Sequence, residues 1–443
     1  MRVKRQIPPD TRYELPKQVT TVYYSGKILL IAPECCNYIV LDNDVQLQFY
    51  QCLENCSLGE ALSKTNISKT DATVVLVQIE AKRFFEDKVS KANGRFQLHL
   101  YLTNACNLRC KHCYMFSGAC KSNELCLDEI KSILCAFKAH HGEFVTFSGG
   151  EILMRKDFMS ILQLGKELQL NIDIMTNGTL WTEPLVKQAA QYISSVQISI
   201  DGFNEEENAK VRGKGYFAKS LKTVERFLHQ GVRVTIAMTP WYDEELFEKK
   251  EAYLNFVKEI KGKYQDYPLE FKFTSDIMDG RDLSLSEEKR KRYFNFMQEI
   301  SNAGSKDKEE DIFVYNQREK ILKDNWCTFG HLTVSADGDV FFCGKVNMVR
   351  PICNIRNTDL NKVMTLSAEA RELSKIQHLS PCKECELRYI CGGGCRIEYF
   401  NWFKDCTGIE SQKLPDSLER KCDFSIKAHY YDLMIKANGK LFK

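Results

Sequence analysis

Residues 96–114 read FQLHLYLTNACNLRCKHCY, and this stretch decides how the rest of the chain is interpreted. Its first part, Phe96–Leu102, has the apolar and β-prone composition of a buried strand. A loop follows directly and carries three cysteines, Cys106, Cys110 and Cys113. Three thiolates on one short loop can bind three irons of a 4Fe–4S cubane, which leaves the fourth iron open to a substrate or cofactor.

A zinc ion is the alternative occupant of this loop. Structural zinc takes four ligands, and the fourth candidate in the loop is His112, which is squeezed between two ligating positions. Three closely spaced cysteines without a well-placed fourth ligand fit zinc poorly. The spacing therefore favours the iron–sulfur cluster.

The sequence from Arg95 to about Phe273 alternates strand and helix patterns, as βα units around a parallel sheet do. The expected strands are Phe96–Leu102, Phe144–Phe147, Ile172–Thr176, Val196–Ile200, Val232–Met238 and Leu269–Phe273, and the expected helices are Leu127–Ala139, Lys156–Leu168, Pro184–Tyr192, Ala218–His229 and Glu244–Ile260. A further helix is expected over Ser284–Ala303. Six parallel strands with helices outside predict an α/β fold, an open (β/α)6 barrel whose chemistry lies at the carboxyl ends of the strands.

A second motif, Gly149-Gly150-Glu151, follows the second expected strand. Paired glycines let a ligand approach the backbone closely, and exposed carbonyls together with Glu151 are suited to hold an ammonium group. Taken alone, Gly-Gly after a strand is most often only a turn. The motif is informative because of its position: it lies at the same predicted end of the parallel strands as the cysteine loop.

Four motifs on successive strands together resemble the radical S-adenosylmethionine (SAM) enzymes. They are the cysteine loop, the GGE motif, Thr176-Asn177-Gly178 and Ile198-Ser199-Ile200-Asp201-Gly202. The resemblance implies that the loop cysteines hold a cluster whose open iron chelates SAM, and that Gly149, Gly150 and Glu151 line the methionine amine. It also implies that Ser199 and Arg212 contact the methionine carboxylate, and that His112 and Tyr114 lie beside the adenine. Ile152 stands where the family often has proline.

The C-terminal cysteines form a second pattern. Cys327 and Cys343 are followed by Cys382-x2-Cys385-x5-Cys391-x3-Cys395 and later by Cys422. This resembles the SPASM domain, an auxiliary iron–sulfur extension of radical SAM enzymes; the alternative is a pair of zinc ribbons. The resemblance implies an outer cluster on Cys382, Cys385, Cys391 and Cys422, and an inner one on Cys327, Cys343 and Cys395. Cys353 is a candidate fourth inner ligand and Cys406 a weaker one.

The first ~90 residues predict a small unit of three strands and three short helices, which is winged-helix-like. Val19–Tyr24 and Lys27–Ile31 flank a Ser-Gly turn, Asn37–Leu41 is the third strand, and Asp42 is the expected N-cap of the first helix. This order resembles the leader-peptide recognition domain of many peptide maturases, which binds a precursor's leader as an added strand. A DNA-binding role is disfavoured, because 42–52 carries no Lys or Arg.

The composition of the chain limits which classes of protein it can belong to. The chain has 443 residues, 44% of them hydrophobic and 27% charged, with a net charge of +3. A nearly neutral chain gives no reason to expect nucleic-acid binding, and the sequence shows no apolar run long enough to suggest a membrane span or signal peptide. The expected location is the cytoplasm, where the 19 clustered cysteines are metal ligands more often than disulfides. Cys35, Cys36, Cys52 and Cys56 are a possible zinc knot, but we expect small buried hydrophobes.

The resemblances imply a radical SAM enzyme that modifies a ribosomally made precursor peptide, with three 4Fe–4S clusters, SAM and a reductant such as flavodoxin or ferredoxin. We expect the modification to be a crosslink, either a thioether or a C–C bond. The predicted units are 1–90 (leader recognition), 95–303 (barrel), 304–430 (SPASM) and 431–443 (tail). One alternative is the anaerobic sulfatase-maturating type of formylglycine-generating enzyme, although Gly344 stands where its aspartate base is expected. The other is a non-catalytic iron–sulfur or zinc scaffold that binds a peptide.

Overall fold

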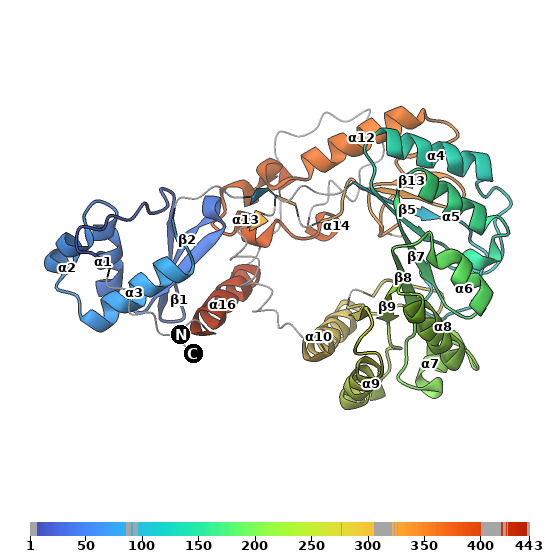
Figure 1. Cartoon of the computed structure of the whole chain (residues 1–443), viewed down its shortest axis with the longest axis horizontal. Helices are drawn as coiled ribbons and strands as arrows, with labels where there is room; N and C mark the ends of the chain where they lie inside the picture. Colours follow the sequence, from blue (N-terminus) through green and yellow to red (C-terminus); the bar gives the residue numbers. More distant parts are fainter. Residues whose placement is uncertain are drawn as a thin grey trace.

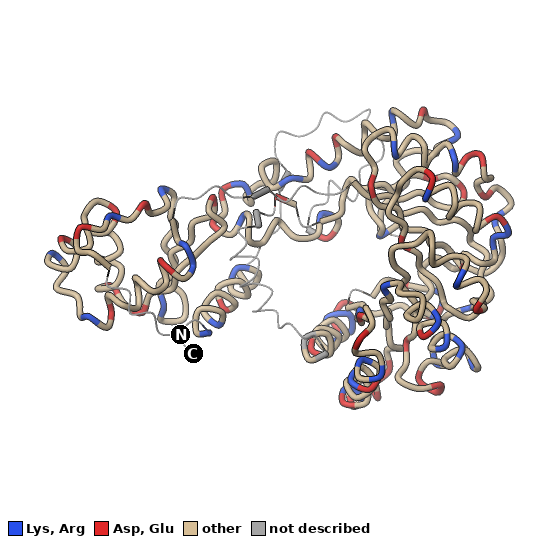
Figure 2. The backbone as a smooth tube through the Cα atoms, viewed as in Figure 1, with Lys and Arg blue, Asp and Glu red and all other residues tan. Residues whose placement is uncertain are grey.

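The computed structural model describes residues 7–85, 90–91, 96–275, 277–304, 321–322, 324–325, 327–346, 348–399, 418–419, 422 and 424–440. The molecule is elongated, with a small N-terminal unit at one end, a large sheet covered by helices at the other, and C-terminal segments between them (Figure 1). Basic and acidic residues are interspersed over all of these parts (Figure 2). No helix in the described ranges combines the length and the apolar character needed to cross a bilayer.

The N-terminal unit has the predicted order of three strands and three helices. They are β1 (Thr20–Tyr24), β2 (Lys27–Ala32), β3 (Asn37–Leu41), α1 (Asp44–Leu53), α2 (Leu58–Thr65) and α3 (Lys69–Ala81). The antiparallel sheet runs β1-β2-β3. The predicted N-cap of α1 is off by one residue, because Asn43 rather than Asp42 accepts the hydrogen bond from the Gln46 N–H. The winged-helix-like description of this unit stays a prediction.

The small sheet is buried on both faces. Alternate residues such as Leu30 and Ile39 pack against α1–α3, whereas Leu29 and Val40 pack against a helix from the other end of the chain, α16 (Phe424–Lys440). This alternation follows from the two-residue period of a strand. The N-terminal unit is therefore docked onto the C-terminal part of the protein.

The large sheet contains the six predicted parallel strands in their predicted order. They are β5 (Gln97–Tyr101), β6 (Phe144–Ser148), β7 (Asn171–Thr176), β8 (Ser195–Ser199), β9 (Arg233–Met238) and β10 (Leu269–Phe273). The helices between and after them are α4 (Leu127–Ala139), α5 (Phe158–Glu167), α6 (Glu183–Ala190), α7 (Glu205–Arg212), α8 (Phe217–His229), α9 (Lys250–Lys263) and α10 (Glu287–Gly304). The single helix expected over 244–260 is divided, because Asp243 caps a separate short 3-10 helix, Glu244–Glu248, before α9 begins.

The C-terminal part extends this sheet, which the sequence did not predict. Strand β12 (Leu332–Val334) pairs in parallel with β5, and the hairpin continues through β13 (Asp339–Phe341) and β14 (Cys353–Asn354). The remaining elements are α12 (Leu360–Leu373), α13 (Arg388–Cys391), α14 (Arg396–Tyr399), and the short strand pairs β4 (Ser90–Lys91) with β11 (Ile321–Leu322) and β15 (Leu379–Ser380) with β16 (Leu418–Glu419). The predicted domain boundary at 430 falls inside α16.

Candidate functional site

The cysteine loop lies at the carboxyl end of β5 and borders a cavity of about 260 Å³. The cavity is lined by Cys106, Cys110, His112, Cys113, Tyr114, Gly149, Gly150, Ser199 and Arg212, among others. These residues follow different strands of the sheet, and parallel strands end at a common edge. The structure thus brings together every residue predicted for this site except Glu151.

Glu151 is not among the residues that line the cavity. It is fully buried and accepts hydrogen bonds from the Thr176 hydroxyl at 2.7 and 2.9 Å and from the Asn177 N–H at 2.8 Å. Burial raises the pKa of this carboxyl, and those hydrogen bonds oppose the rise. The Glu151 side chain therefore holds the turn after β7, and the predicted contact of this residue with an amine stays a prediction.

The paired glycines are required by the cysteine loop itself. Gly149 has a φ of +141°, and a Cβ there would lie 2.4 Å from the Thr103 carbonyl oxygen. The Gly150 N–H donates to the same carbonyl, and the Glu151 N–H donates to the Ala105 carbonyl. The motif therefore anchors the start of the loop while its backbone faces the cavity.

A buried ionic network lies beside the loop, centred on Asp201, a residue of the fourth motif with no predicted role. Its Oδ2 lies 2.7 Å from Arg212 Nε and 2.9 Å from His112 Nε2, and its Oδ1 accepts from the Thr239 N–H at 2.7 Å. Burial opposes ionisation of Asp201, but Arg212 and His112 outweigh it and hold its pKa below the usual range. Two of the predicted SAM-contact side chains, Arg212 and His112, are thus oriented by one carboxylate.

The electrostatics of the loop suit an anionic metal cluster. Burial raises the pKa of Cys106 to about 11 and also raises that of Cys110, so the thiolates need positive charge close by. Arg212 Nη1 lies 3.8 Å from Cys110 Sγ, and the Leu108 N–H donates to Cys106 Sγ at 3.4 Å. The residues present therefore fit a cubane cluster held by three cysteines.

Residues 280–282 clamp the loop from the far side. The Arg281 guanidinium donates to the Cys110 carbonyl at 2.9 Å, and the Asp282 N–H donates to the Lys111 carbonyl. A Cβ at Gly280 would lie 2.4 Å from the His112 carbonyl oxygen. Sequence reasoning missed this clamp, because 280–282 lies about 170 residues from the loop and matches no metal or cofactor motif.

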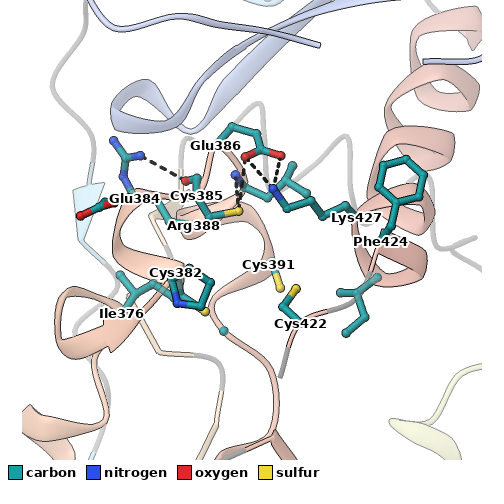
Figure 3. Close-up of a pocket in the computed structure, with 14 residues that line it drawn as sticks. Ile376, Cys382, Glu384, Cys385, Glu386, Arg388, Cys391, Cys422, Phe424 and Lys427 are labelled. Carbon is teal, nitrogen blue, oxygen red and sulfur yellow. Dashed lines mark hydrogen bonds and ion pairs between the residues drawn. The ribbon is translucent and has the colours of Figure 1, made fainter. Parts of the chain in front are cut away.

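The four cysteines assigned to the outer cluster line a second cavity, of about 460 Å³. They are Cys382, Cys385, Cys391 and Cys422, which come from three separate segments (Figure 3). Glu386 lies at the rim, where it pairs with Lys427 at 2.9 Å and accepts a hydrogen bond from Tyr431. The Leu387 N–H donates to Cys385 Sγ at 3.4 Å, as backbone amides do to cluster-bound sulfur.

Three cysteines assigned to the inner cluster also lie together. The thiols of Cys327 and Cys395 share a hydrogen bond, which lowers the pKa of Cys327 and raises that of Cys395. Burial raises the pKa of Cys343, and the negative charge of Cys395 contributes to the rise. Cys353 lies in β14, opposite Val340, and its role as fourth ligand stays a prediction. Cys406 lies outside the described residues.

In the described ranges no three His, Cys, Asp or Glu side chains converge closely enough to hold one metal ion. Three of the four N-terminal cysteines behave as hydrophobes, as expected: Cys35 and Cys52 belong to one apolar core and Cys36 to another. The fourth, Cys56, belongs to neither core, and its Sγ lies 3.1 Å from Lys64 Nζ.

Comparison with family models gives two matches. Residues 100–254 match the radical SAM superfamily, and residues 326–386 match an iron–sulfur cluster-binding domain, SPASM. The first match contains the cysteine loop, the glycine motif and the Asp201 network. The second contains four of the auxiliary cysteines and the strands that extend the large sheet.

Individual relatives have different roles. The sporulation killing factor maturation protein SkfB of Bacillus subtilis is 33% identical over 141 residues, 32% of this chain and 34% of that protein. An AdoMet-dependent heme synthase of Methanosarcina barkeri is 26% identical over 324 residues, 68% of this chain and 90% of that protein. This chain spans about a third of the length of the first curated relatives it matches.

A solved structure shares the fold. It is that of anSMEcpe with bound AdoMet, which has a TM-score of 0.52, 20% identity, and coverage of 79% of this chain and 97% of that one. At this identity the likeness concerns the architecture alone.

Proposed function

Because the chain is a radical SAM/SPASM protein whose cofactors are 4Fe–4S clusters and SAM, we propose that it modifies a ribosomally made precursor peptide. The observation that supports this most is the cavity in which three cysteines, two glycines and the Asp201 network meet. When bound, a reduced cluster supplies the electron that splits SAM into methionine and a 5′-deoxyadenosyl radical, which takes a hydrogen atom from the substrate.

Different residues of the cavity bind the cluster and the two ends of the SAM methionine moiety. Cys106, Cys110 and Cys113 hold the cluster and leave one iron to SAM. The backbone of Gly149-Gly150 faces the methionine amine, and Ser199 and Arg212 face its carboxylate. Since Asp201 neutralises part of the Arg212 charge and fixes its orientation, the guanidinium is preorganised for a carboxylate.

A peptide substrate is supported by two features. The relative SkfB is a maturation protein, and the N-terminal unit presents a three-stranded sheet to which a leader strand can add. The heme synthase relative shows that the same domains also occur in an enzyme acting on another kind of substrate. The formylglycine-generating alternative lacks its base, since Gly344 has no side chain to take a proton.

The first experiment tests radical generation. Full-length protein is reconstituted anaerobically with iron and sulfide, reduced with dithionite, and assayed for deoxyadenosine. Replacing the three loop cysteines with Ala should remove about four iron and abolish deoxyadenosine formation. The matched control replaces Cys120, Cys126 and Cys135, which are exposed, and should change neither value. Deoxyadenosine from the loop variant would refute the assignment.

The second experiment tests the peptide. Short peptides encoded by reading frames next to this chain's gene are incubated with the reduced enzyme and SAM, and their masses are measured. Loss of two hydrogens, with deoxyadenosine formed in proportion, is the expected result for a crosslink. Deoxyadenosine without a change in any peptide would support the cofactor chemistry and refute the peptide substrate.

A further inference from the structure

The two auxiliary sites are joined by a short link of five residues, Cys391–Cys395. Helix α13 ends at Cys391, which is assigned to the outer cluster, and α14 begins directly after Cys395, which is assigned to the inner one. Three glycines separate these two cysteines. Since a chain of this length spans at most about 14 Å, the link keeps ligands of the two clusters close together.

The link is a tight left-handed turn. Gly392, Gly393 and Gly394 all have a positive φ, of 62°, 79° and 68°. This conformation is uncommon for other residue types, and more so for several residues in succession. The turn brings the carbonyl groups of Gly392 and Gly394 to one side chain, because both accept a hydrogen bond from Arg396.

The Arg396 guanidinium lies inside this turn, and the residue is 0% exposed. Besides the two glycine carbonyls, the guanidinium donates to the Ser374 carbonyl, from Nε at 2.8 Å and from Nη2 at 2.6 Å. A Cβ at Gly393 would lie 2.9 Å from Arg396 Nη1. The glycine at this position therefore leaves room for a buried positive charge next to the link.

Arg396 acts on the inner site in two ways. Its backbone N–H donates to Cys327 Sγ at 3.5 Å. The pKa of the Cys327 thiol is lowered to about 6, chiefly by the hydrogen bond with Cys395, and the N–H and the positive charge of Arg396 add to this effect. Both interactions favour negative charge on a ligand of the inner site.

A 4Fe–4S cluster responds to the same two influences. Its reduction potential depends on the net charge and on hydrogen bonds to the sulfurs. Reduction adds one electron, and therefore one negative charge, so a positive charge nearby favours the reduced state. Burial strengthens this effect, because the interaction between two charges is screened less in the protein interior than in water.

We propose that Arg396 raises the reduction potential of the inner cluster by holding a buried positive charge beside its ligands. The proposal requires the inner cluster on Cys327, Cys343 and Cys395, and it goes beyond the proposed function because no peptide takes part. The alternative is a purely structural Arg396 that only holds the glycine turn. The two roles differ in what they need: the effect on the potential needs the charge, whereas the turn needs only hydrogen-bond donors.

The test uses full-length protein whose three loop cysteines are replaced with Ala, so that only the auxiliary clusters contribute to the EPR spectrum. Their midpoint potentials are measured by anaerobic titration with dithionite. Arg396→Gln keeps hydrogen-bond donors without the charge, and Arg396→Lys is the matched control that keeps the charge. In Arg396→Gln the reduced-to-oxidised ratio of the inner cluster at a fixed potential should fall about tenfold, a shift of about 59 mV for one electron. Arg396→Lys should stay close to the unsubstituted protein.

The outer cluster is the internal reference. Its signal is identified by its loss in Cys422→Ala, and its potential should shift less than that of the inner cluster in Arg396→Gln. An unchanged inner potential in Arg396→Gln, or equal shifts in the two Arg396 variants, would leave a structural role only and overturn the proposal. Iron and EPR evidence for a single auxiliary cluster in protein that keeps Arg396 would overturn it as well.

A second measurement keeps Arg396 and serves if its variants fail to assemble the inner cluster. The protein is labelled with ¹⁵N-arginine, and the reduced inner cluster is examined by pulsed EPR in the Cys422→Ala background, where the outer cluster is absent. A ¹⁵N coupling is expected, because the Arg396 N–H donates to Cys327 Sγ, and it would support the proposal. Absence of the coupling would show that Arg396 does not lie beside this cluster and would overturn the proposal.

Discussion

Replacing Asp201 with Asn should both destabilise the protein and weaken SAM binding. The carboxylate is 1% exposed and contacts Arg212 Nε, His112 Nε2 and the Thr239 N–H. If the asparagine keeps its oxygen on the Thr239 N–H, its NH₂ group faces Arg212 and His112. An NH₂ group cannot accept a hydrogen bond from them, so the buried Arg212 guanidinium loses its negatively charged partner. Breaking a buried ion pair in this way costs about 3–5 kcal/mol. At roughly 2–4 °C per kcal/mol, the transition of the large sheet should fall by about 6–20 °C.

The effect on SAM follows from the lost orientation of Arg212. A charge-assisted hydrogen bond contributes about 1.5–3 kcal/mol, so SAM affinity measured by calorimetry should fall roughly ten- to hundredfold. The control is Asp173→Asn, which changes a half-buried carboxylate bonded to Ser195, outside the cavity lining, and should leave SAM affinity unchanged. Because the folded-state pKa of Asp201 is depressed, its contribution is fully present above the unfolded value of about 3.9 and is lost only as pH falls through the folded pKa. Wild-type SAM affinity in Asp201→Asn would refute the positioning role.

Three further predictions concern other parts of the chain. Anaerobic reconstitution should give roughly 8–12 iron per chain from three cubane clusters; zinc in place of iron would contradict all three assignments. Deleting residues 1–90 should abolish peptide modification but spare uncoupled SAM cleavage, since the cavity draws no lining residue from that unit; full-rate modification by the fragment 91–443 would contradict this. Hydrogen bonds from Arg356 and the Cys126 N–H lower the pKa of Glu129 to about 2, so the stability difference between wild type and Glu129→Gln should be complete above about pH 4.3 and shrink toward pH 2. If the difference in unfolding free energy between wild type and Glu129→Gln, measured with denaturant, did not change with pH, the hydrogen bonds from Arg356 and the Cys126 N–H would not be what keeps the Glu129 carboxylate charged.

The sequence predicted what is encoded locally. Cysteine spacing fixes which thiols share a loop, and strand-helix alternation fixes the order of a parallel sheet, so both were confirmed. The hydrogen bonds of the Glu151 side chain were not predicted, because its partners, Thr176 and Asn177, belong to the next strand and the turn after it. Asp201 and the 280–282 clamp act across long sequence separations, and the extension of the sheet by β12 depends on pairing with β5. Such long-range partners leave no periodic or spacing signal in one sequence.

The loop between Cys385 and Cys391 joins the two ends of the molecule. On one side its cysteines line the outer cavity. On the other, Arg388 pairs with Glu34 and the Tyr389 carbonyl faces the Cys36 thiol at 3.6 Å, both in the N-terminal unit. The seven residues Cys385–Cys391 therefore contact both the outer cavity and the N-terminal unit. If the N-terminal unit holds a leader as proposed, a cluster bound by this segment would also fix the distance between that unit and the SAM cavity, and that distance would determine which residues of a tethered peptide reach the cavity.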